Sequence, residues 1–584
     1  MKTIRFLLSI TSAFFFFSCS YTPKESSVML SGTSLTSLNE NAETGTLSQD
    51  GENASAFFSF PEEVLTELTR RKLSQEGVSV CVTIRKTDAA SEGNFCFSFL
   101  YDGDLTKSGK LKNSETLTER PMTRGILSAS EKDSVKVSMC LSKTKNERGF
   151  YITSNTPVFI EKAEFLNAKA GWDRDENLFS FSDKGGTTDF NFSKCSIENA
   201  GEYFSSTASG EKREPLISIT FYDRLNALDE ADPQKQKEVI AAFGSEEFSI
   251  RLSKNTGTKF FHKKALKKMP ETISLLRAGE CIKSIFIVYD ETEITSETEE
   301  VLTPIKTDLG LITEWPRSSW RCSEYELFEW DMFPHVLFFD FADYNIQNKF
   351  LTRLAFFAEK TGYKGTLVSN YIVETQHGYN AHDYKAEDLA AFFSLAHKTK
   401  FSLNKRELLL KKILTANRII IPESDGTFSK GEGSIISISR ESPSYLREKF
   451  LAHESWHGIY FTDPDFRYFV KNVYNSFPED SMSFIKTYWE YAPGLGYDRS
   501  DEYLMQNEFM AYIMQQDIST VKGYFTGLTN RNTVAEKCPE LGEYVRNTNA
   551  ADFYSAAQKL NSYAFNTWGL AAGRVQLVTR LTAR

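Results

Sequence analysis

A helix with two histidines on one face is predicted at residues 451–460, which read Leu451-Ala452-His453-Glu454-Ser455-Trp456-His457-Gly458-Ile459-Tyr460. Side chains four positions apart lie on the same face of a helix, so the imidazoles of His453 and His457 can reach one metal ion. Glu454 is placed to accept a proton from a water molecule at that ion. With seven histidines in the chain, this spacing arises by chance on the order of 0.01 times. The alternative is a helix with two unrelated histidines.

The sequence before this helix predicts a strand. Residues 431–439 are rich in isoleucine and serine and begin between glycines, which favours a short buried strand. Ser442, Pro443 and Ser444 suit the cap and the first turn of the helix that follows. The predicted order is therefore a strand, a short connection and the helix with the two histidines.

The His453-Glu454-x-x-His457 spacing resembles the HExxH motif of zinc metallopeptidases, and the strand-then-helix order resembles that of the zincin peptidases. The resemblance implies one zinc ion, with both histidines as ligands and Glu454 as the general base that takes a proton from an activated water. It also implies that the strand beside the helix binds an extended peptide through its backbone.

Two carboxylates compete to be the third ligand, because a catalytic zinc site has three protein ligands and an open position for water. Asp463 stands six residues after His457, where the related metzincins carry a ligand. That pattern needs a glycine where this chain has Tyr460, so that the backbone can turn. We therefore expect the helix to continue through Tyr460 and to direct Asp463 elsewhere.

Glu508 is the preferred third ligand. It is the one acidic residue in 503–514, where apolar side chains recur at helical spacing. A buried carboxylate is costly unless it is paired or binds a metal. Asn507-Glu508-x-x-Ala511 also resembles the Glu-x-x-Ala element on the third-ligand helix of gluzincin metallopeptidases. In the alternative, Glu508 is a buried carboxylate in an ion pair.

The gluzincin resemblance further implies a side chain that donates a hydrogen bond to the oxyanion of the reaction. Tyr497, Tyr503 and His382 carry suitable donors, and the two tyrosines directly precede or begin the helix that carries Glu508. His382-Asp383 could instead line the substrate cleft, or His382 could lie solvated in a loop. The sequence leaves this choice open and identifies no acceptor that would orient the two histidine ligands.

The composition describes a folded protein with several domains. A chain of 584 residues exceeds the size of a single hydrophobic core and predicts about two to four domains. Its 41% hydrophobic and 25% charged residues exclude a disordered chain. The net charge of −10 argues against a nucleic acid as a partner.

The N-terminus predicts export and a lipid anchor. Lys2 and Arg5 precede an apolar run at 6–17 that is too short to span a bilayer, which is typical of a signal peptide. The Phe-Phe-Ser-Cys sequence that ends at Cys19 resembles the lipobox of bacterial lipoproteins, although its first position is usually aliphatic. The resemblance implies a signal peptide at 1–19, a lipid on Cys19 and a place in the cell envelope outside the cytoplasm, on the periplasmic face or the cell surface. The alternative is ordinary signal cleavage.

Two β-rich regions are predicted after a flexible tether. Residues 20–54 are polar and predict the tether. Residues 55–197 contain short alternating runs separated by turns, which predict a β-sandwich-like domain. After a polar linker, residues 215–315 predict a second, mixed β-rich domain. Its expected elements are strands at 216–221 and 284–289 and a helix at 234–243.

The cysteines and aromatic residues of these regions are assigned to the core. Seven cysteines follow Cys19 without a Cys-x-x-Cys pair, which excludes a typical thiolate zinc site. A bridge between Cys81 and Cys96 is one open alternative to buried thiols. Tyr151 and Trp172 are expected in the core and not on a glycan- or peptide-binding surface.

Residues 330–584 are predicted to form the catalytic domain. An apolar strand at its start and several helical periodicities indicate an α+β, mainly helical domain. The expected elements before the motif are strands at 335–341 and 365–373, a loop at 377–384, and helices at 346–360, 385–398 and 403–417.

The complete prediction is a multidomain protein, with β-rich, sandwich-like N-terminal domains followed by a mainly helical, zincin-like catalytic domain. Its expected function is that of a lipid-anchored zinc metallopeptidase acting on a peptide or protein substrate. One alternative is a surface lipoprotein that binds glycan or protein through its sandwich domains and has a degenerate zinc site. The other is a structural zinc site, which is disfavoured because such sites usually have four protein ligands.

Overall fold

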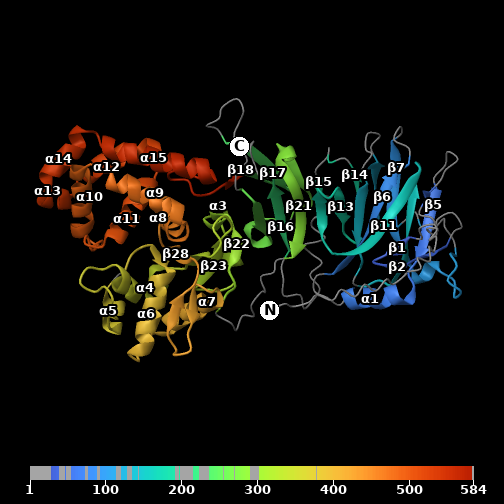
Figure 1. Ribbon diagram of the computed structural model, residues 1–584, viewed down its shortest axis with the longest axis horizontal. Helices are drawn as coiled ribbons and strands as arrows, with labels where there is room; N and C mark the ends of the chain where they lie inside the picture. The colour runs from blue at the N-terminus through green and yellow to red at the C-terminus, as the bar shows by residue number, and fades with distance from the viewer. Residues whose placement is uncertain are drawn as a thin grey trace, which may run out of the picture.

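The protein is elongated, with β-sheets at one end and helices at the other (Figure 1). This computed structural model confirms the multidomain order, β-rich first and mainly helical second. Cys19 and the rest of the predicted signal peptide lie outside the described residues. Within the described part, no helix is both long and apolar enough to cross a bilayer. The structure describes residues 28–38, 46–47, 54–72, 77–87, 92–112, 117, 120–127, 134–142, 144–190, 192, 196–197, 215–222, 236–253, 256–268, 270–289, 301–376 and 378–581.

Eleven strands form one sheet through the whole β-rich part: β1 (Met29–Leu30), β2 (Thr33–Ser34), β4 (Thr46–Leu47), β6 (Val78–Lys86), β9 (Val135–Cys140), β11 (Val158–Asn167), β12 (Ala170–Asp173), β13 (Leu178–Phe181), β16 (Pro215–Phe221), β19 (Thr258–His262) and β21 (Ile282–Tyr289). Their order is β19-β16-β21-β12-β13-β9-β6-β11-β1-β2, with β4 on β11. The β12–β21 pair, with Ala170 opposite Ile287, joins strands from the two predicted β-rich regions. The sheet is therefore continuous across the predicted linker, and the domain limits stay a prediction.

A second sheet covers the N-terminal part of the first: β3 (Thr36–Ser37), β5 (Ala54–Ser59), β7 (Gly93–Tyr101), β8 (Met122–Leu127), β10 (Glu147–Ser154) and β14 (Gly185–Asp189). The inward side chains of both sheets share one buried cluster, in which Phe97 packs edge-on against Phe150 at 5.6 Å between ring centroids. Helix α1 (Glu62–Lys72) packs beside β6. Two sheets that share a core in this way make a β-sandwich.

Parts of the predicted tether belong to this sandwich. Leu30 in β1 is 1% exposed and pairs with Ala163 of β11. Leu47 in β4 is 4% exposed and pairs with Val158. Single leucines in a polar stretch are therefore sufficient to anchor short strands on this sheet.

The middle of the chain forms a second sandwich that the C-terminus completes. Its second sheet has the order β15-β20-β17-β18-β29. Residues 238–243 form a strand, so the predicted helix at 234–243 is wrong. Val239, Ala241 and Phe243 are buried at every second position, which is the period of a strand. The strands are β15 (Ser196–Ile197), β17 (Glu238–Phe243), β18 (Glu246–Arg251), β20 (Ile273–Arg277) and β29 (Val578–Leu581).

A buried ion cluster joins the middle sandwich to the C-terminal part. The Lys259 ammonium on β19 donates to Asp308 and to Asp331, each at 2.9 Å, and all three residues are buried. Asp308 caps α3 (Leu309–Ile312) and also accepts from the backbone N–H groups of Leu577 and Val578 at 3.1 Å. One carboxylate thus holds the start of the C-terminal part and the approach to β29.

A five-stranded sheet forms the centre of the C-terminal part, in the order β22-β23-β24-β28-β25: β22 (Ile305–Thr307), β23 (Tyr325–Trp330), β24 (Val336–Phe341), β25 (His382–Lys385) and β28 (Ser434–Ser439). Alternate residues of β24 enter different cores. Leu337 and Phe339 belong to one buried cluster, and Val336 and Phe338 to the other. Both faces are covered, which explains why every residue of this strand except Asp340 is apolar.

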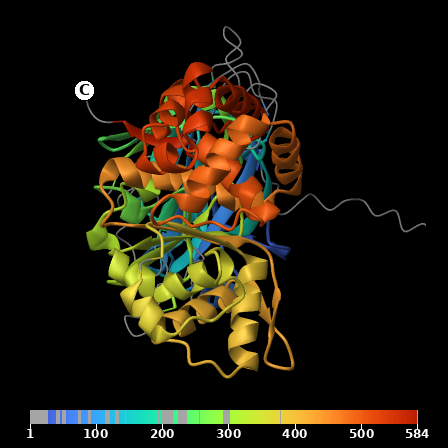
Figure 2. The same cartoon turned by 90° about the vertical axis from the view of Figure 1, so that its left-hand side faces the viewer.

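Helices cover each face of this sheet. Figure 2 shows the yellow helices below it and the orange and red helices above it. The first group is α4 (Tyr344–Ala358), α5 (Asn370–Thr375), α6 (Ala386–Lys398) and α7 (Lys405–Ala416), with a hairpin of β26 (Ile420–Pro422) and β27 (Phe428–Lys430). The second group is α8 (Ser444–Thr462), α9 (Pro464–Asn475), α10 (Glu479–Tyr491), α11 (Glu502–Met514), α12 (Val521–Leu528), α13 (Asn532–Lys537), α14 (Pro539–Asn547) and α15 (Ala551–Trp568).

Three further local predictions are corrected by the structure. The strand expected at 365–373 is a loop that leads into α5. The loop expected at 377–384 ends in strand β25, because residues 382–385 pair with β28. Cys81 and Cys96 are free and lie on different sheets, so the bridge between them is not formed.

Candidate metal centre

Helix α8 is held tightly between the central sheet and α11. At Gly458 an added Cβ would lie 2.9 Å from Cγ1 of Val336, so glycine permits the close approach of α8 to β24. The indole N–H of Trp456 donates to the carbonyl of Met514 at 3.0 Å. These contacts fix the side of α8 from which His453 and His457 project.

The end of α8 excludes Asp463 from this group. As predicted, the helix continues through Tyr460 and ends at Thr462. Asp463 then caps α9, and its carboxylate accepts from the backbone N–H of Phe466 at 2.8 Å. Asp463 is therefore a capping residue of the next helix.

His453, His457 and Glu508 converge between α8 and α11. One potential ligand atom from each lies within 4.8 Å of the others. Glu508 Oε2 is 3.6 Å from His453 Nε2, and Glu508 Oε1 is 3.8 Å from His457 Nε2. All three residues are buried. The described residues add no fourth member to this group. Two imidazoles and one carboxylate are a donor set that catalytic zinc sites use.

A second group of potential ligands overlaps the first. Asp383, Glu454 and His457 also bring ligand atoms within 4.8 Å of one another. His457 belongs to both groups because its two ring nitrogens face opposite carboxylates: Nε2 faces Glu508, and Nδ1 lies 3.7 Å from Oδ2 of Asp383. The second group offers one imidazole and two carboxylates, a donor set less typical of zinc than the first.

An oxygen atom faces the outer ring nitrogen of each histidine. The side-chain oxygen of Gln515 lies 3.2 Å from Nδ1 of His453, within hydrogen-bond distance. Oδ2 of Asp383 lies 3.7 Å from Nδ1 of His457, just beyond that distance. Such acceptors fix the tautomer and orientation of metal-binding histidines. Sequence reasoning identified neither residue as an acceptor, although it named Asp383 with His382 as a possible part of the substrate cleft, and Asp383 does line the cavity. Gln515 had a signal, because it follows Glu508 by seven residues and so lies two turns along the same face of the helix.

The burial of these groups favours a bound cation. Burial lowers the pKa of His453 to about 4, which keeps its imidazole neutral and able to bind a metal. Burial, and next the nearby Asp383, raises the pKa of Glu454 well above its usual range. Both ring nitrogens of His457 and Oε2 of Glu454 and of Glu508 have no hydrogen-bond partner among the described residues. A divalent cation would satisfy several of these buried atoms, so the residues fit a metal ion.

The two ligand-bearing helices come from separate parts of the sequence, since Glu508 follows His457 by 51 residues (508 − 457).

No protein-family model and no curated protein matches this chain. The chemistry of the site is therefore inferred from the side chains that converge in it.

A cavity of about 690 Å³ opens beside the candidate metal centre. His453 and Glu454 form part of its wall, so the centre is accessible from the cavity. Aromatic, acidic and basic side chains form much of the remaining wall, among them Glu359, Tyr379, Asp383, Lys449, Tyr497 and Tyr512. The volume is that of a typical small-molecule or short-peptide site.

Of the three predicted oxyanion or substrate residues, the structure places only Tyr497 at the cavity. Burial raises the pKa of Glu508 to about 8, and a hydrogen bond from Tyr497 is one of the smaller effects that oppose this rise. Tyr503 packs on Tyr460 at 5.3 Å between ring centroids, away from the cavity wall. Nδ1 of His382 lies 2.8 Å from the hydroxyl of Tyr384 in the core.

Tyr379 and Tyr512 also line the cavity, and sequence reasoning missed both. The ring of Tyr512 lies 5.1 Å from that of His453. Burial raises the pKa of each tyrosine well above its usual value, so each hydroxyl stays protonated and able to donate. Tyr512 had a sequence signal, because it stands one turn after Glu508 on the same helix face.

The strand expected to bind substrate through its backbone is not at the edge of the sheet. β28 pairs with β24 on one side and with β25 on the other, so its backbone is already used. The edge strand on this side of the sheet is β25, next to β28. It contributes Asp383 to the cavity wall, so this edge adjoins the site.

Replacement of Asp383 by asparagine is expected to weaken zinc affinity by about 10- to 100-fold, because His457 loses the carboxylate that faces its outer nitrogen. Competition with a chromogenic chelator would measure the affinity. Asp388→Asn, a matched change on α6 outside both ligand groups, serves as the control. An unchanged affinity would contradict the role of Asp383, and complete loss of binding would place the metal in the second group.

Proposed function

We propose that this protein is a zinc-dependent peptidase of the gluzincin type. The observation that carries the proposal is the convergence of His453, His457 and Glu508 from two helices at the wall of a large cavity. Glu454 lies directly beside them with one carboxylate oxygen that lacks a hydrogen-bond partner among the described residues. A structural site would need a fourth protein ligand, and an open position is what a catalytic site requires.

Each residue of the site would have a separate role in the reaction. His453, His457 and Glu508 would hold the ion, which would supply a Lewis acid that polarises the scissile carbonyl and acidifies a water molecule. Glu454 would accept the proton of that water and pass it to the leaving amine. Tyr497, Tyr379 and Tyr512 are the donors near enough to the cavity to stabilise the oxyanion.

The raised pKa of Glu454 suits a residue with this task. A general base works best when its pKa lies nearer to the operating pH than that of an exposed carboxylate. Burial is the largest single cause of the raised pKa of Glu454, and the charges of Asp383 and Glu508 add to it. A nearby divalent cation would favour the charged form and move the pKa back down.

We also propose that the peptidase is attached to the cell envelope by a lipid on Cys19. This part rests on the signal-peptide pattern and the lipobox-like sequence at residues 16–19. Its substrate would then be a peptide or protein outside the cytoplasm.

Removal of the metal is the direct test of the proposed function. Protein dialysed against a chelator is expected to lose hydrolysis of a mixed peptide library and to regain it with about one zinc per chain. The measurements are zinc content by mass spectrometry and product formation by peptide mass analysis. Protein that binds no zinc, or that binds it and cleaves no peptide, would contradict the proposal.

A further inference from the structure

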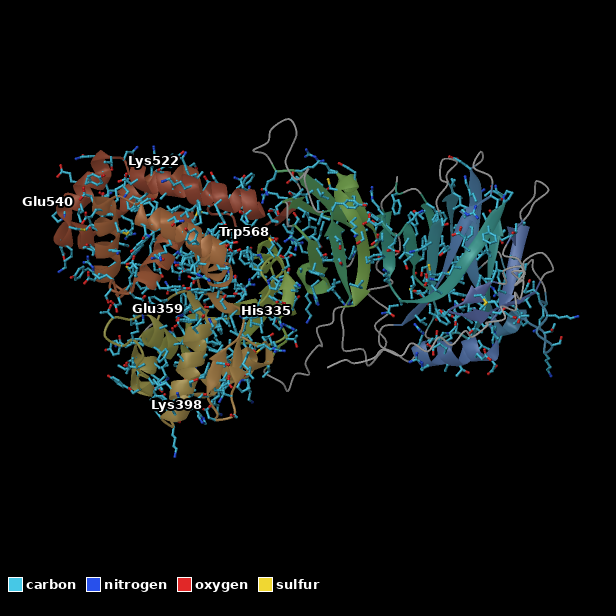
Figure 3. The ribbon with its side chains drawn as sticks, in the orientation of Figure 1. His335, Glu359, Lys398, Lys522, Glu540 and Trp568 are labelled. Atoms are coloured by element: carbon cyan, nitrogen blue, oxygen red, sulfur yellow. The ribbon has the colours of Figure 1, made fainter. Side chains whose placement is uncertain are left out.

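Glu359 is a carboxylate of the cavity wall that has no partner in the part of the chain that the structure describes. It follows the last residue of α4 and lies where the α4–α7 group meets the upper helices (Figure 3). Among the described residues, no hydrogen bond or ion pair reaches its carboxylate. The neighbouring carboxylates act on it, since burial, Asp383 and Glu508 together raise its pKa well above the usual range.

The cation next to Glu359 in sequence is directed elsewhere. The ammonium of Lys360 donates to the carbonyls of Gly494 and Leu495, at 2.8 and 3.1 Å, and lies 3.7 Å from the ring centroid of Tyr379. These contacts hold it against the loop before α11. Lys360 therefore reduces the negative charge around Glu359 and makes no ion pair with it.

The other lysine of the cavity wall, Lys449, contacts a tyrosine and not Glu359. Lys449 stands one turn before His453 on α8, and its ammonium lies 4.1 Å from the ring centroid of Tyr524. Burial, and next the positive charge of Arg531, lowers the pKa of Lys449. The charge of Lys449 in turn contributes to the lowered pKa of His453. Among the described residues no ion pair joins Lys449 to a carboxylate, so it is not the partner of Glu359 or Asp383, which define the acidic end of the cavity.

A metal ion at the candidate centre would leave Glu359 without a partner. Glu359 belongs to neither group of potential ligands, and its neighbour Lys360 is held by the carbonyls of residues 494 and 495. The carboxylates Asp383 and Glu508 lie near enough to act on it. A carboxylate in such a place is costly unless a cation pairs with it. A cationic group of the substrate would supply that partner and favour the charged form of Glu359.

We propose that Glu359 makes the acidic end of the cavity a subsite for a substrate ammonium group, and so determines specificity. This inference rests on the proposed peptidase function and adds a substrate class to it. The ammonium group could come from a free amino terminus or from a lysine-like side chain. Both would form a charge-assisted hydrogen bond with Glu359.

Three peptide hydroxamates that bind zinc directly test this proposal by affinity and not by turnover. The first is Leu-Leu-hydroxamate with a free amino terminus, the second is its N-acetyl form, and the third is N-acetyl-Lys-Leu-hydroxamate. Calorimetry on the zinc-loaded full-length protein would give the affinity of each. At least one ammonium-bearing probe is expected to bind about 10- to 100-fold more tightly than the neutral one. The preferred probe identifies the source of the ammonium group.

Glu359→Gln keeps the size of the side chain and removes its charge. In this variant the preference for the ammonium probe is expected to fall to within about threefold of none, while the affinity for the neutral probe is retained. Glu374→Gln on α5 removes the same charge from an exposed residue that does not line the cavity, and is expected to change neither affinity.

Two outcomes would overturn the inference alone: equal affinity of wild type for all three probes, or an equal loss of all three in Glu359→Gln, which would indicate a structural role. Failure of wild-type protein to bind zinc or any hydroxamate would overturn the proposed function, and the inference with it.

Discussion

Replacement of Glu454 by glutamine is expected to lower kcat for peptide hydrolysis by about 10²- to 10⁴-fold, the usual contribution of a general base. Glutamine has nearly the same shape but cannot take a proton from water. The zinc content is expected to stay at the wild-type level, because Glu454 does not belong to the group formed by His453, His457 and Glu508. Paired measurements of zinc content and peptide cleavage on the same preparations would check both parts.

Glu448→Gln is the matched control for this experiment. Glu448 lies on the exposed side of the same helix, six residues earlier. Its replacement is expected to leave activity and zinc content unchanged. If Glu454→Gln lost zinc while Glu448→Gln kept it, the ion would belong to the second group, with Asp383 and Glu454 as ligands. If Glu454→Gln kept full activity, the general-base role would be wrong.

Replacement of Glu508 by alanine is expected to abolish tight zinc binding. It removes the only ligand that α11 supplies and leaves two histidines. The expected loss of zinc affinity is larger than the roughly 10- to 100-fold loss for Asp383, which contacts a ligand and not the metal. It also removes a carboxylate that lies within 3.8 Å of both imidazoles. Chelator competition and metal analysis would measure the loss.

Asp463→Ala provides the contrast. The change removes the cap of α9, so a loss of about 1 kcal/mol in the free energy of unfolding is expected. Zinc affinity is expected to stay unchanged, because Asp463 is bound to the N–H of Phe466. Loss of zinc in Asp463→Ala with retention in Glu508→Ala would reverse the assignment of the third ligand.

The parts of the site that the sequence predicted are those encoded along single helices. The spacing of His453 and His457 is a property of one helix, and the absence of a glycine at position 460 was enough to predict that α8 continues. Glu508 stood out because it is the one acidic residue in an apolar periodic segment. In each of these cases the prediction depended only on residues within one or two helical turns in the sequence.

The missing parts depend on pairing between distant segments. Asp383 approaches His457 because β25 pairs with β28, and nothing near Asp383 in the sequence indicates that pairing. Glu359 reaches the same cavity from the end of α4. The error at 234–243 has the same origin, since charged residues with helical propensity precede a strand whose partners, β18 and β20, fix it as part of a sheet.

The C-terminal strand has a consequence for how the protein is made. β29 closes the edge of β18, yet Val578 follows Arg251 by 327 residues (578 − 251). While the intervening chain is still being synthesised, β18 lacks this neighbour and presents unpaired backbone groups, which are a template for association with other chains. Chains interrupted before β29 therefore carry an open sheet edge far from the interruption, and they are the forms of this protein most prone to aggregate.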